Sequence, residues 1–363
     1  MKYLNEYRNL EATKNYLKRI EKTVTRPWKI MEVCGGQTHG LIKNGIIDLL
    51  PDKVQMIHGP GCPVCVTPLV LIDKAIALMD QGVIVCSFGD MIRVPGSKKS
   101  LLEAKSDGGD LRILYSPLEA VRIAADNPDR EVVFFAVGFE TTAPANALSV
   151  LHAKNEGLKN YSILVSHVLV PPAMEAILDD EFCNIDAFLG AGNVCAIMGT
   201  SEYHELSTKY EIPIVVTGFE PLDLVEGIFM AVSQLEAGRF VVENQYARIV
   251  KEEGNLAAKE VIAKVFEIGD RDWRGIGTIP KSGYVLRSEY SHFDAELKFG
   301  VESISTKEHA TCIAGAILKG IKKPGECSEF GSRCTPSNPM GAPMVSSEGA
   351  CAAYYHFATN LNN

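Results

Sequence analysis

Residues 28–50 read W-K-I-M-E-V-C-G-G-Q-T-H-G-L-I-K-N-G-I-I-D-L-L and carry the pattern from which the fold class follows. Residues 28–33 are predicted to form a strand, which runs directly into the glycine-containing loop that begins at Cys34. A helical pattern follows through Leu50. A strand that leads straight into a helix is typical of parallel sheets with helices on both faces.

The same order of strand, loop and helix recurs along the next part of the chain. A shift of about 130 residues aligns several strand ends, and Val33 then falls on Val165. We therefore expect two similar parallel-sheet α/β domains that face a cleft, with residues 1–116, including an N-terminal helix, in the first and residues 117–220 in the second. Further strands are expected at residues 54–57, 83–88, 112–115, 132–137, 162–166, 187–189 and 213–216.

The character of the sequence changes after Leu222. Two helical stretches, at about 222–237 and 243–267, precede a segment rich in glycine, proline and cysteine. Residues 221–363 are therefore expected to form a third, irregular and mostly helical domain.

Composition excludes several classes of protein. The 363 residues carry a formal net charge of −9, which argues against a general nucleic-acid-binding protein. No apolar run approaches the roughly 20 residues that a membrane-spanning helix needs, and the charged start of the chain has no apolar signal core. We therefore expect a cytoplasmic protein whose ten cysteines are metal ligands, catalytic thiols or core residues rather than disulfides.

Three cysteines lie in the irregular stretch C-S-E-F-G-S-R-C-T-P-S-N-P-M-G-A-P-M-V-S-S-E-G-A-C, which spans residues 327–351. They are Cys327, Cys334 and Cys351, and Cys312 lies upstream of them. The spacings are too long for paired zinc knuckles and suit an iron–sulfur cluster, because a cluster can take thiolate ligands from a winding loop. Redox-active thiols and unligated structural cysteines are the alternatives.

A second cysteine motif, Cys62-Pro63-Val64-Cys65, lies in a turn rich in glycine and proline ahead of an expected helix. The positive end of a helix dipole lowers the pKa of a nearby thiol, and the spacing suits reversible disulfide formation. We therefore expect a redox-active dithiol, with half of a zinc site or a structural pair as the alternatives.

Single residues near the ends of strands are further candidates. Cys34 and His39 could bind a metal together, or His39 could activate the thiol; the alternative is a buried cysteine beside a solvent-exposed histidine. Glu140 could act as a general acid or base or bridge to the other domain, unless this stretch only begins a helix. Glu348, next to the cysteine-rich stretch, could take part in the movement of protons or ligands.

Five motifs together resemble the HypD family of hydrogenase maturation factors over nearly the whole length of the chain. The resemblance implies a scaffold with redox activity on which the Fe(CN)2CO group of NiFe hydrogenases is assembled. It also implies two partners, a small HypC-type chaperone and a HypE-type protein that supplies cyanide as a protein thiocyanate. The motifs are M-E-V-C-G-G-Q-T-H at 31–39, H-G-P-G-C-P-V-C at 58–65, G-F-E-T-T-A-P at 138–144, W-R-G-I-G at 273–277, and C-T-P with M-V-S-S-E-G-A-C-A-A-Y-Y at 334–336 and 344–355.

The resemblance further implies roles for individual residues. Cys34 would bind the transient Fe(CN)2CO iron together with a cysteine of the chaperone. Cys62 and Cys65 would be the redox dithiol, and the C-terminal cysteines would hold a 4Fe–4S cluster.

The chain departs from the family pattern at two positions. Pro343 stands where many members carry a cysteine, so Cys312 is expected to join Cys327, Cys334 and Cys351 as a cluster ligand. Gln37 stands where a histidine is common, which leaves His39 as the histidine of that loop.

A free-standing thiol–disulfide oxidoreductase is the main alternative function. It would use Cys62, Cys65 and the cluster to act on small protein disulfides, and it would need neither Cys34 nor an iron-bearing partner. A third hypothesis is a binding module in which the cluster only stabilises the C-terminal domain.

Overall fold

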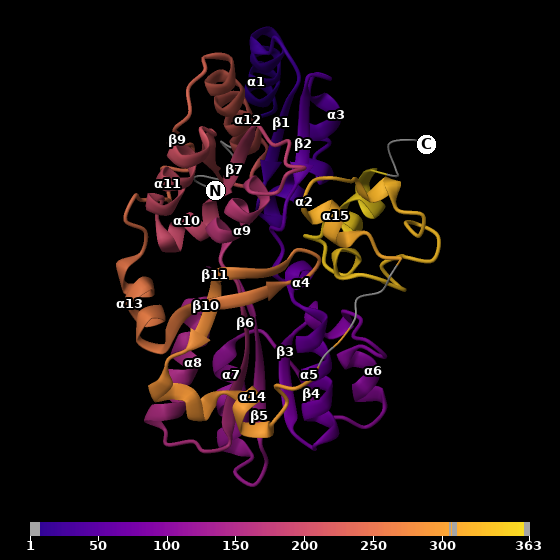
Figure 1. Ribbon diagram of the computed structural model, residues 1–363, viewed down its shortest axis with the longest axis vertical. Coiled ribbons are helices and arrows are strands. Elements are labelled where there is room, and N and C mark those ends of the chain that lie inside the picture. Colours follow the sequence, from indigo (N-terminus) through magenta and orange to yellow (C-terminus); the bar gives the residue numbers. More distant parts are fainter. Residues whose placement is uncertain (1–7, 305, 307–310, 359–363) are drawn as a thin grey trace.

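The computed structural model describes residues 8–304, 306 and 311–358 of the chain. Two parallel sheets lie towards opposite ends of the long axis, and a two-stranded antiparallel hairpin lies between them (Figure 1). The C-terminal segment, residues 311–358 and yellow in Figure 1, lies to one side near α2 and α4. The predicted α/β class, with parallel sheets and a more helical C-terminal region, is confirmed.

The first sheet, called sheet A, has the strand order β2-β1-β7-β8-β9. β1 lies between β2 and β7, so that Glu32 at its end lies beside His58 of one neighbour and Leu189 of the other. The carboxyl ends of these parallel strands therefore meet at one edge of the sheet. The strands are β1 (Trp28–Glu32), β2 (Val54–His58), β7 (Ala187–Ala191), β8 (Ile214–Thr217) and β9 (Val242–Asn244).

The second sheet, called sheet B, has the strand order β4-β3-β5-β6 and is also parallel. Every residue of β5 and β6 is buried, and β5 is accordingly a continuous run of apolar residues and glycine. The strands are β3 (Ile84–Phe88), β4 (Leu111–Leu114), β5 (Val132–Gly138) and β6 (Tyr161–His167).

Helices cover both sheets. Proline occupies the first turn of several of them, where no backbone donor is needed. No helix in the described part of the chain is long and apolar enough to cross a membrane. The helices are α1 (Leu10–Thr23), α2 (Gly35–Lys43), α3 (Ile46–Leu49), α4 (Pro63–Val66), α5 (Leu69–Asp80), α6 (Leu101–Ser106), α7 (Pro117–Asp126), α8 (Ala143–Asn155), α9 (Val170–Leu178), α10 (Gly192–Met198), α11 (Ser201–Tyr210), α12 (Pro221–Glu236), α13 (Leu256–Val265), α14 (Ala295–Phe299), α15 (Ala314–Leu318) and α16 (Ala350–Ala353).

The sheets do not follow the predicted domain boundaries at residues 116 and 220. β1 and β2 belong to sheet A together with β7 to β9, whereas β3 and β4 belong to sheet B. The strands aligned by the shift of 130 residues are not equivalent either, because β1 lies in sheet A and β6 in sheet B. The order of strands along the chain cannot reveal that β1 pairs with a strand as distant as β7.

The hairpin of β10 (Phe266–Trp273) and β11 (Gly277–Leu286) was not predicted. The expected helix at 243–267 is also shorter than predicted, since β9 precedes it and α13 begins only at Leu256. The Trp273 indole is buried and donates to the Ser282 hydroxyl at 2.9 Å. The Leu169 N–H donates to the Ser282 carbonyl at 2.8 Å, which attaches the hairpin to the end of sheet B.

His167 at the end of β6 is fully buried, and its Nε2 lies 2.5 Å from the Asn146 amide nitrogen. Since that amide nitrogen can only donate, Nε2 carries no proton. Burial lowers the pKa of His167 to about 3, and the charge of Arg271 adds to the effect. The imidazole is therefore neutral in the folded chain at neutral pH.

Stability should fall as the pH drops below about 6.5, the ordinary pKa of histidine, because the unfolded chain then binds a proton that the folded chain does not. The loss should approach about 1.4 kcal/mol per pH unit and continue towards the folded-state pKa. Urea unfolding between pH 7.5 and pH 5 should show it, and His167→Gln should flatten the slope. Equal slopes for the two proteins would contradict this assignment.

Candidate metal and redox site

The loops that follow β1 and β2 lie directly against each other. The Gly35 N–H donates to the Gly61 carbonyl oxygen at 2.9 Å. A Cβ atom on Gly61 would lie 2.2 Å from the Cys34 backbone nitrogen, so only glycine permits this approach. The contact places Cys34 beside the turn that carries Cys62.

Cys34 directly precedes α2, and its side chain is buried. The thiol donates to Asn193 Oδ1 at 3.4 Å, and Asn193 lies on α10, the helix that follows β7. Burial raises the pKa of Cys34 to about 12, and the negative charge of Glu348 adds to the effect. The thiol is therefore protonated at neutral pH, and a metal ion that binds it must displace the proton.

His39 lies on α2 and faces the C-terminal segment. Its Nδ1 is 3.1 Å from the carbonyl oxygen of Ser347, and its ring packs edge-on against Phe357. In this conformation the imidazole connects α2 to the segment that carries Glu348. The Cys34 thiol instead makes its hydrogen bond to Asn193, so the two side chains do not share a partner. A metal role for His39 stays a prediction.

Cys62 and Cys65 lie at the two ends of one tight turn, and both are buried. The Cys62 sulfur accepts a hydrogen bond from the Cys65 N–H at 3.3 Å. Burial raises the pKa of the Cys65 thiol well above its ordinary value, and its hydrogen bond to the Cys62 sulfur raises it further. The two sulfur atoms are therefore neighbours, as a reversible disulfide requires.

The four C-terminal cysteines line one small pocket. Burial raises the pKa of Cys351, and the nearby sulfurs of Cys312, Cys334 and Cys327 raise it further, in that order. A Cβ atom on Gly341 would lie 2.5 Å from the Cys312 sulfur, so the chain packs closely there. The remainder of the lining is mostly apolar: Ile313, Ala314, Ile317, Phe330, Pro343 and Met344.

This donor set fits an iron–sulfur cluster better than a single ion. In the described part of the chain, no three His, Cys, Asp or Glu side chains are arranged to hold one metal ion. The thiolates of a 4Fe–4S cluster bind different iron atoms and lie farther apart than the ligands of one ion. The four thiols line one mostly apolar pocket and could supply such ligands, and Cys312 lies in the same pocket as Pro343.

The three groups of cysteines meet at one place. The sulfur of Cys351 and the carboxylate of Glu348 both contribute to the raised pKa of Cys65, and Glu348 also acts on Cys34. α16, which carries Cys351, contacts α2 directly after Cys34. The structure thus brings together cysteines from both ends of the chain.

The two candidate glutamates lie in different surroundings. A Cβ atom on Gly35 would lie 2.5 Å from Glu348 Cβ, so Glu348 covers the Cys34 loop. Partial burial raises the pKa of Glu348, and the negative charge of Asp90 adds to the effect. Glu140 is buried, with Oε1 accepting from the Val170 N–H at 2.9 Å, and burial raises its pKa to about 8. Glu140 therefore holds the start of α9, and its proton-transfer role stays a prediction.

Sequence reasoning missed the polar residues that surround Cys34. Glu32 and Thr38 are buried beside it, and Asn193 Oδ1 accepts a hydrogen bond from its thiol. Glu32 alone left a signal, because a carboxylate inside an apolar strand is rarely buried without hydrogen-bonding partners.

Gly61→Ala should destabilise the protein by about 1–3 kcal/mol, because the new methyl group would overlap the Cys34 backbone. Gly89→Ala is the matched control: Gly89 also follows a strand, but a Cβ there would meet only Ile113 Cγ2, at 4.0 Å. Urea unfolding of both variants checks this. Equal stability of the two would show that the loops after β1 and β2 can separate at little cost.

Comparison with known proteins agrees with the geometry. Residues 11–358 match the family model described as "HypD: Hydrogenase formation hypA family". The chain is 47% identical to the hydrogenase maturation factor HypD of Azotobacter vinelandii, over 98% of this chain and 97% of that protein. It is 46% identical to HypD2 of Bradyrhizobium diazoefficiens (98% and 97%) and 44% identical to HypD of Escherichia coli K12 (98% of each). The chain therefore belongs to the HypD family of hydrogenase maturation factors.

Proposed function

We propose that this chain is a redox-active scaffold on which the Fe(CN)2CO group of NiFe hydrogenases is assembled. A small HypC-type chaperone binds the same iron, and a HypE-type partner delivers cyanide as a protein thiocyanate. The observation that carries the proposal is the meeting of Cys34, the Cys62–Cys65 pair and the four-cysteine pocket at one place.

Cys34 suits an iron atom that is cargo rather than a permanent cofactor. It offers one soft thiolate, and the neighbouring Gly36 adds no side chain there, since a Cβ on Gly36 would lie 3.9 Å from the Cys34 sulfur. A site with one protein thiolate leaves positions on iron for the chaperone's thiolate, two cyanides and a carbonyl. Binding must also release the Cys34 proton, since burial holds the pKa of this thiol at about 12.

Release of cyanide from a thiocyanate, R–S–C≡N, is a two-electron reduction. Two thiols provide the electrons and the protons: R–S–C≡N and two cysteine thiols become R–SH, HCN and one disulfide. Cys62 and Cys65 are adjacent free thiols and can form that disulfide. A 4Fe–4S cluster held by Cys312, Cys327, Cys334 and Cys351 would supply one-electron transfer for restoring the dithiol.

A thiol–disulfide oxidoreductase remains the second candidate, because the adjacent Cys62 and Cys65 suit it equally well. It gives no role to Cys34, although the Cys34 loop is packed so tightly on the dithiol turn that Gly61 cannot carry a side chain. Whether Cys34 binds iron therefore best distinguishes the two functions.

Cys34→Ala should abolish the cyanide and carbonyl infrared bands of the anaerobically purified complex with the chaperone, because the thiolate ligand is lost. Iron and sulfide bound in the C-terminal pocket should stay at the wild-type level. His39→Ala should weaken the bands less. Cys86→Ala is the control, since Cys86 is also fully buried but lies in sheet B.

Full cyanide and carbonyl bands in the Cys34→Ala complex would contradict the proposal, because the iron would then be held elsewhere. Absence of bands from the wild-type complex, together with a working dithiol, would favour the oxidoreductase.

The dithiol should titrate as one two-electron step. Thiol trapping across a series of redox potentials should show Cys62 and Cys65 changing together, because their sulfurs are adjacent. The step should vanish in Cys62→Ala and in Cys65→Ala and persist in Cys183→Ala. If the wild-type pair stays open to alkylation under every oxidising condition, this part of the function is wrong.

A further inference from the structure

Glu32 is a buried carboxylate directly before the Cys34 loop. It ends β1, and none of its surface is exposed. A carboxylate in such a position is costly unless several donors surround it. Three donors do so: the Cys34 N–H reaches Oε2 at 3.0 Å, the His58 Nδ1 reaches Oε1 at 2.8 Å, and the Thr38 hydroxyl also bonds Oε1.

The hydrogen bonds of His58 extend this group towards the C-terminus. Because the carboxylate of Glu32 can only accept, His58 Nδ1 is the donor in that hydrogen bond. Nε2 lies 3.2 Å from the Tyr354 hydroxyl, and the two rings meet edge-on at 5.4 Å. Burial raises the pKa of Tyr354 to about 12, so its hydroxyl is protonated at neutral pH.

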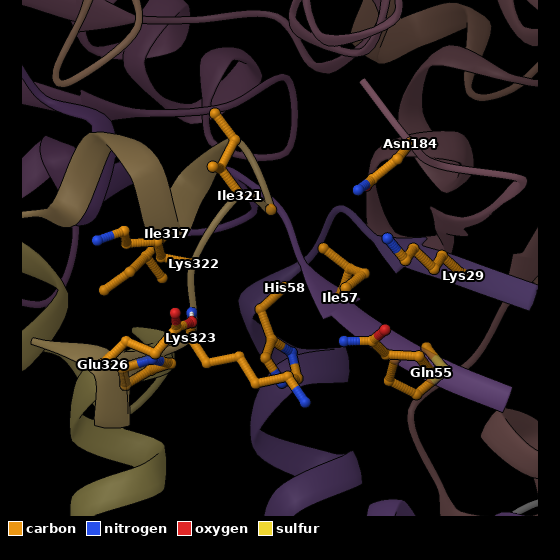
Figure 2. Close-up of a pocket in the computed structure, with 13 residues that line it drawn as sticks. Lys29, Gln55, Ile57, His58, Asn184, Ile317, Ile321, Lys322, Lys323 and Glu326 are labelled. Carbon is orange, nitrogen blue, oxygen red and sulfur yellow. Dashed lines mark hydrogen bonds between the residues drawn. The ribbon is translucent and has the colours of Figure 1, made fainter. Parts of the chain in front are cut away.

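Tyr354 belongs to the segment that carries the cluster ligands. It directly follows α16, on which Cys351 lies. Figure 2 shows His58, the last residue of β2, lining one pocket with Lys322, Lys323 and Glu326, which lie just ahead of Cys327. His58 therefore contacts the C-terminal segment at Tyr354 and also lines, together with residues of that segment, a cavity of about 110 Å³.

We propose that Glu32 is the positioning residue of Cys34, and that the chain of hydrogen bonds Tyr354–His58–Glu32 couples the Cys34 backbone to the helix that carries Cys351. A shift of α16 changes the hydrogen bond between Tyr354 and His58 and so the orientation of the His58 ring. The reoriented ring then changes the hydrogen bond that Glu32 accepts from the Cys34 N–H. The inference rests on the proposed function only in treating Cys34 as an iron ligand and Cys351 as a cluster ligand; the contacts do not depend on it.

The coupling can be tested without any bound iron. Tyr354→Phe keeps the ring against His58 and removes only the hydroxyl, whereas Glu32→Gln keeps the shape and removes the charge. Tyr161→Phe is the matched control, because Tyr161 also loses one buried hydroxyl bond, to Ser149 at 2.8 Å, but lies in sheet B.

Hydrogen–deuterium exchange at the Cys34 amide, resolved by overlapping peptides, is the first measurement. Exchange should speed up about tenfold in Tyr354→Phe and more in Glu32→Gln, since one neutral or one charge-assisted hydrogen bond is lost. Tyr161→Phe should exchange as the wild type does. Wild-type exchange in Tyr354→Phe would overturn the coupling, even if Glu32→Gln failed to fold.

The second measurement is the infrared spectrum of the iron group in the chaperone complex. Glu32→Gln and Tyr354→Phe should shift the frequencies of the cyanide and carbonyl bands, and Tyr161→Phe should not. If Glu32 and Tyr354 served stability alone, the variants would change the intensity of the bands but not their frequencies. Unshifted bands in both variants would overturn the positioning role. If the wild-type complex shows no bands while the amide exchange changes as expected, the proposed function fails and the coupling stands.

Discussion

The contact between Gly61 and the Cys34 backbone brings Cys34 next to the turn that carries Cys62 and Cys65. β1 and β2 are parallel neighbours, so their carboxyl-end loops must share one edge of sheet A. Because Gly61 carries no side chain, the loops approach until a Cβ on Gly61 would lie 2.2 Å from the Cys34 nitrogen. The C-terminal segment then packs over both loops and adds the sulfur of Cys351.

Burial gives these sulfurs a common property. The pKa values of Cys34, Cys65 and Cys351 are all raised, first by burial and then by neighbouring negative groups. Thiols of this kind are poor nucleophiles at neutral pH until a metal binds or a partner changes their surroundings. A metal ion that binds these thiols must therefore displace their protons.

Local patterns predicted local structure well. The eight strands expected from apolar runs are all present, and the cysteine motifs lie in loops at strand ends or in the irregular C-terminal segment, as expected. The membership of the sheets was not predictable, because β1 pairs with β7 across a long stretch of chain. Asn193, which accepts the hydrogen bond of the Cys34 thiol, and Tyr354, which bonds His58, were missed for the same reason, since both reach the site only through tertiary contacts.

The central claim is that the C-terminal cysteines hold an iron–sulfur cluster against the dithiol and the Cys34 loop. Anomalous X-ray scattering at the iron edge, from crystals of the anaerobically purified protein, tests it most directly. The account predicts iron density bonded to the sulfurs of Cys312, Cys327, Cys334 and Cys351, with Cys351 facing Cys65. A pocket without iron, or iron bound there with Cys312 turned away, would contradict it.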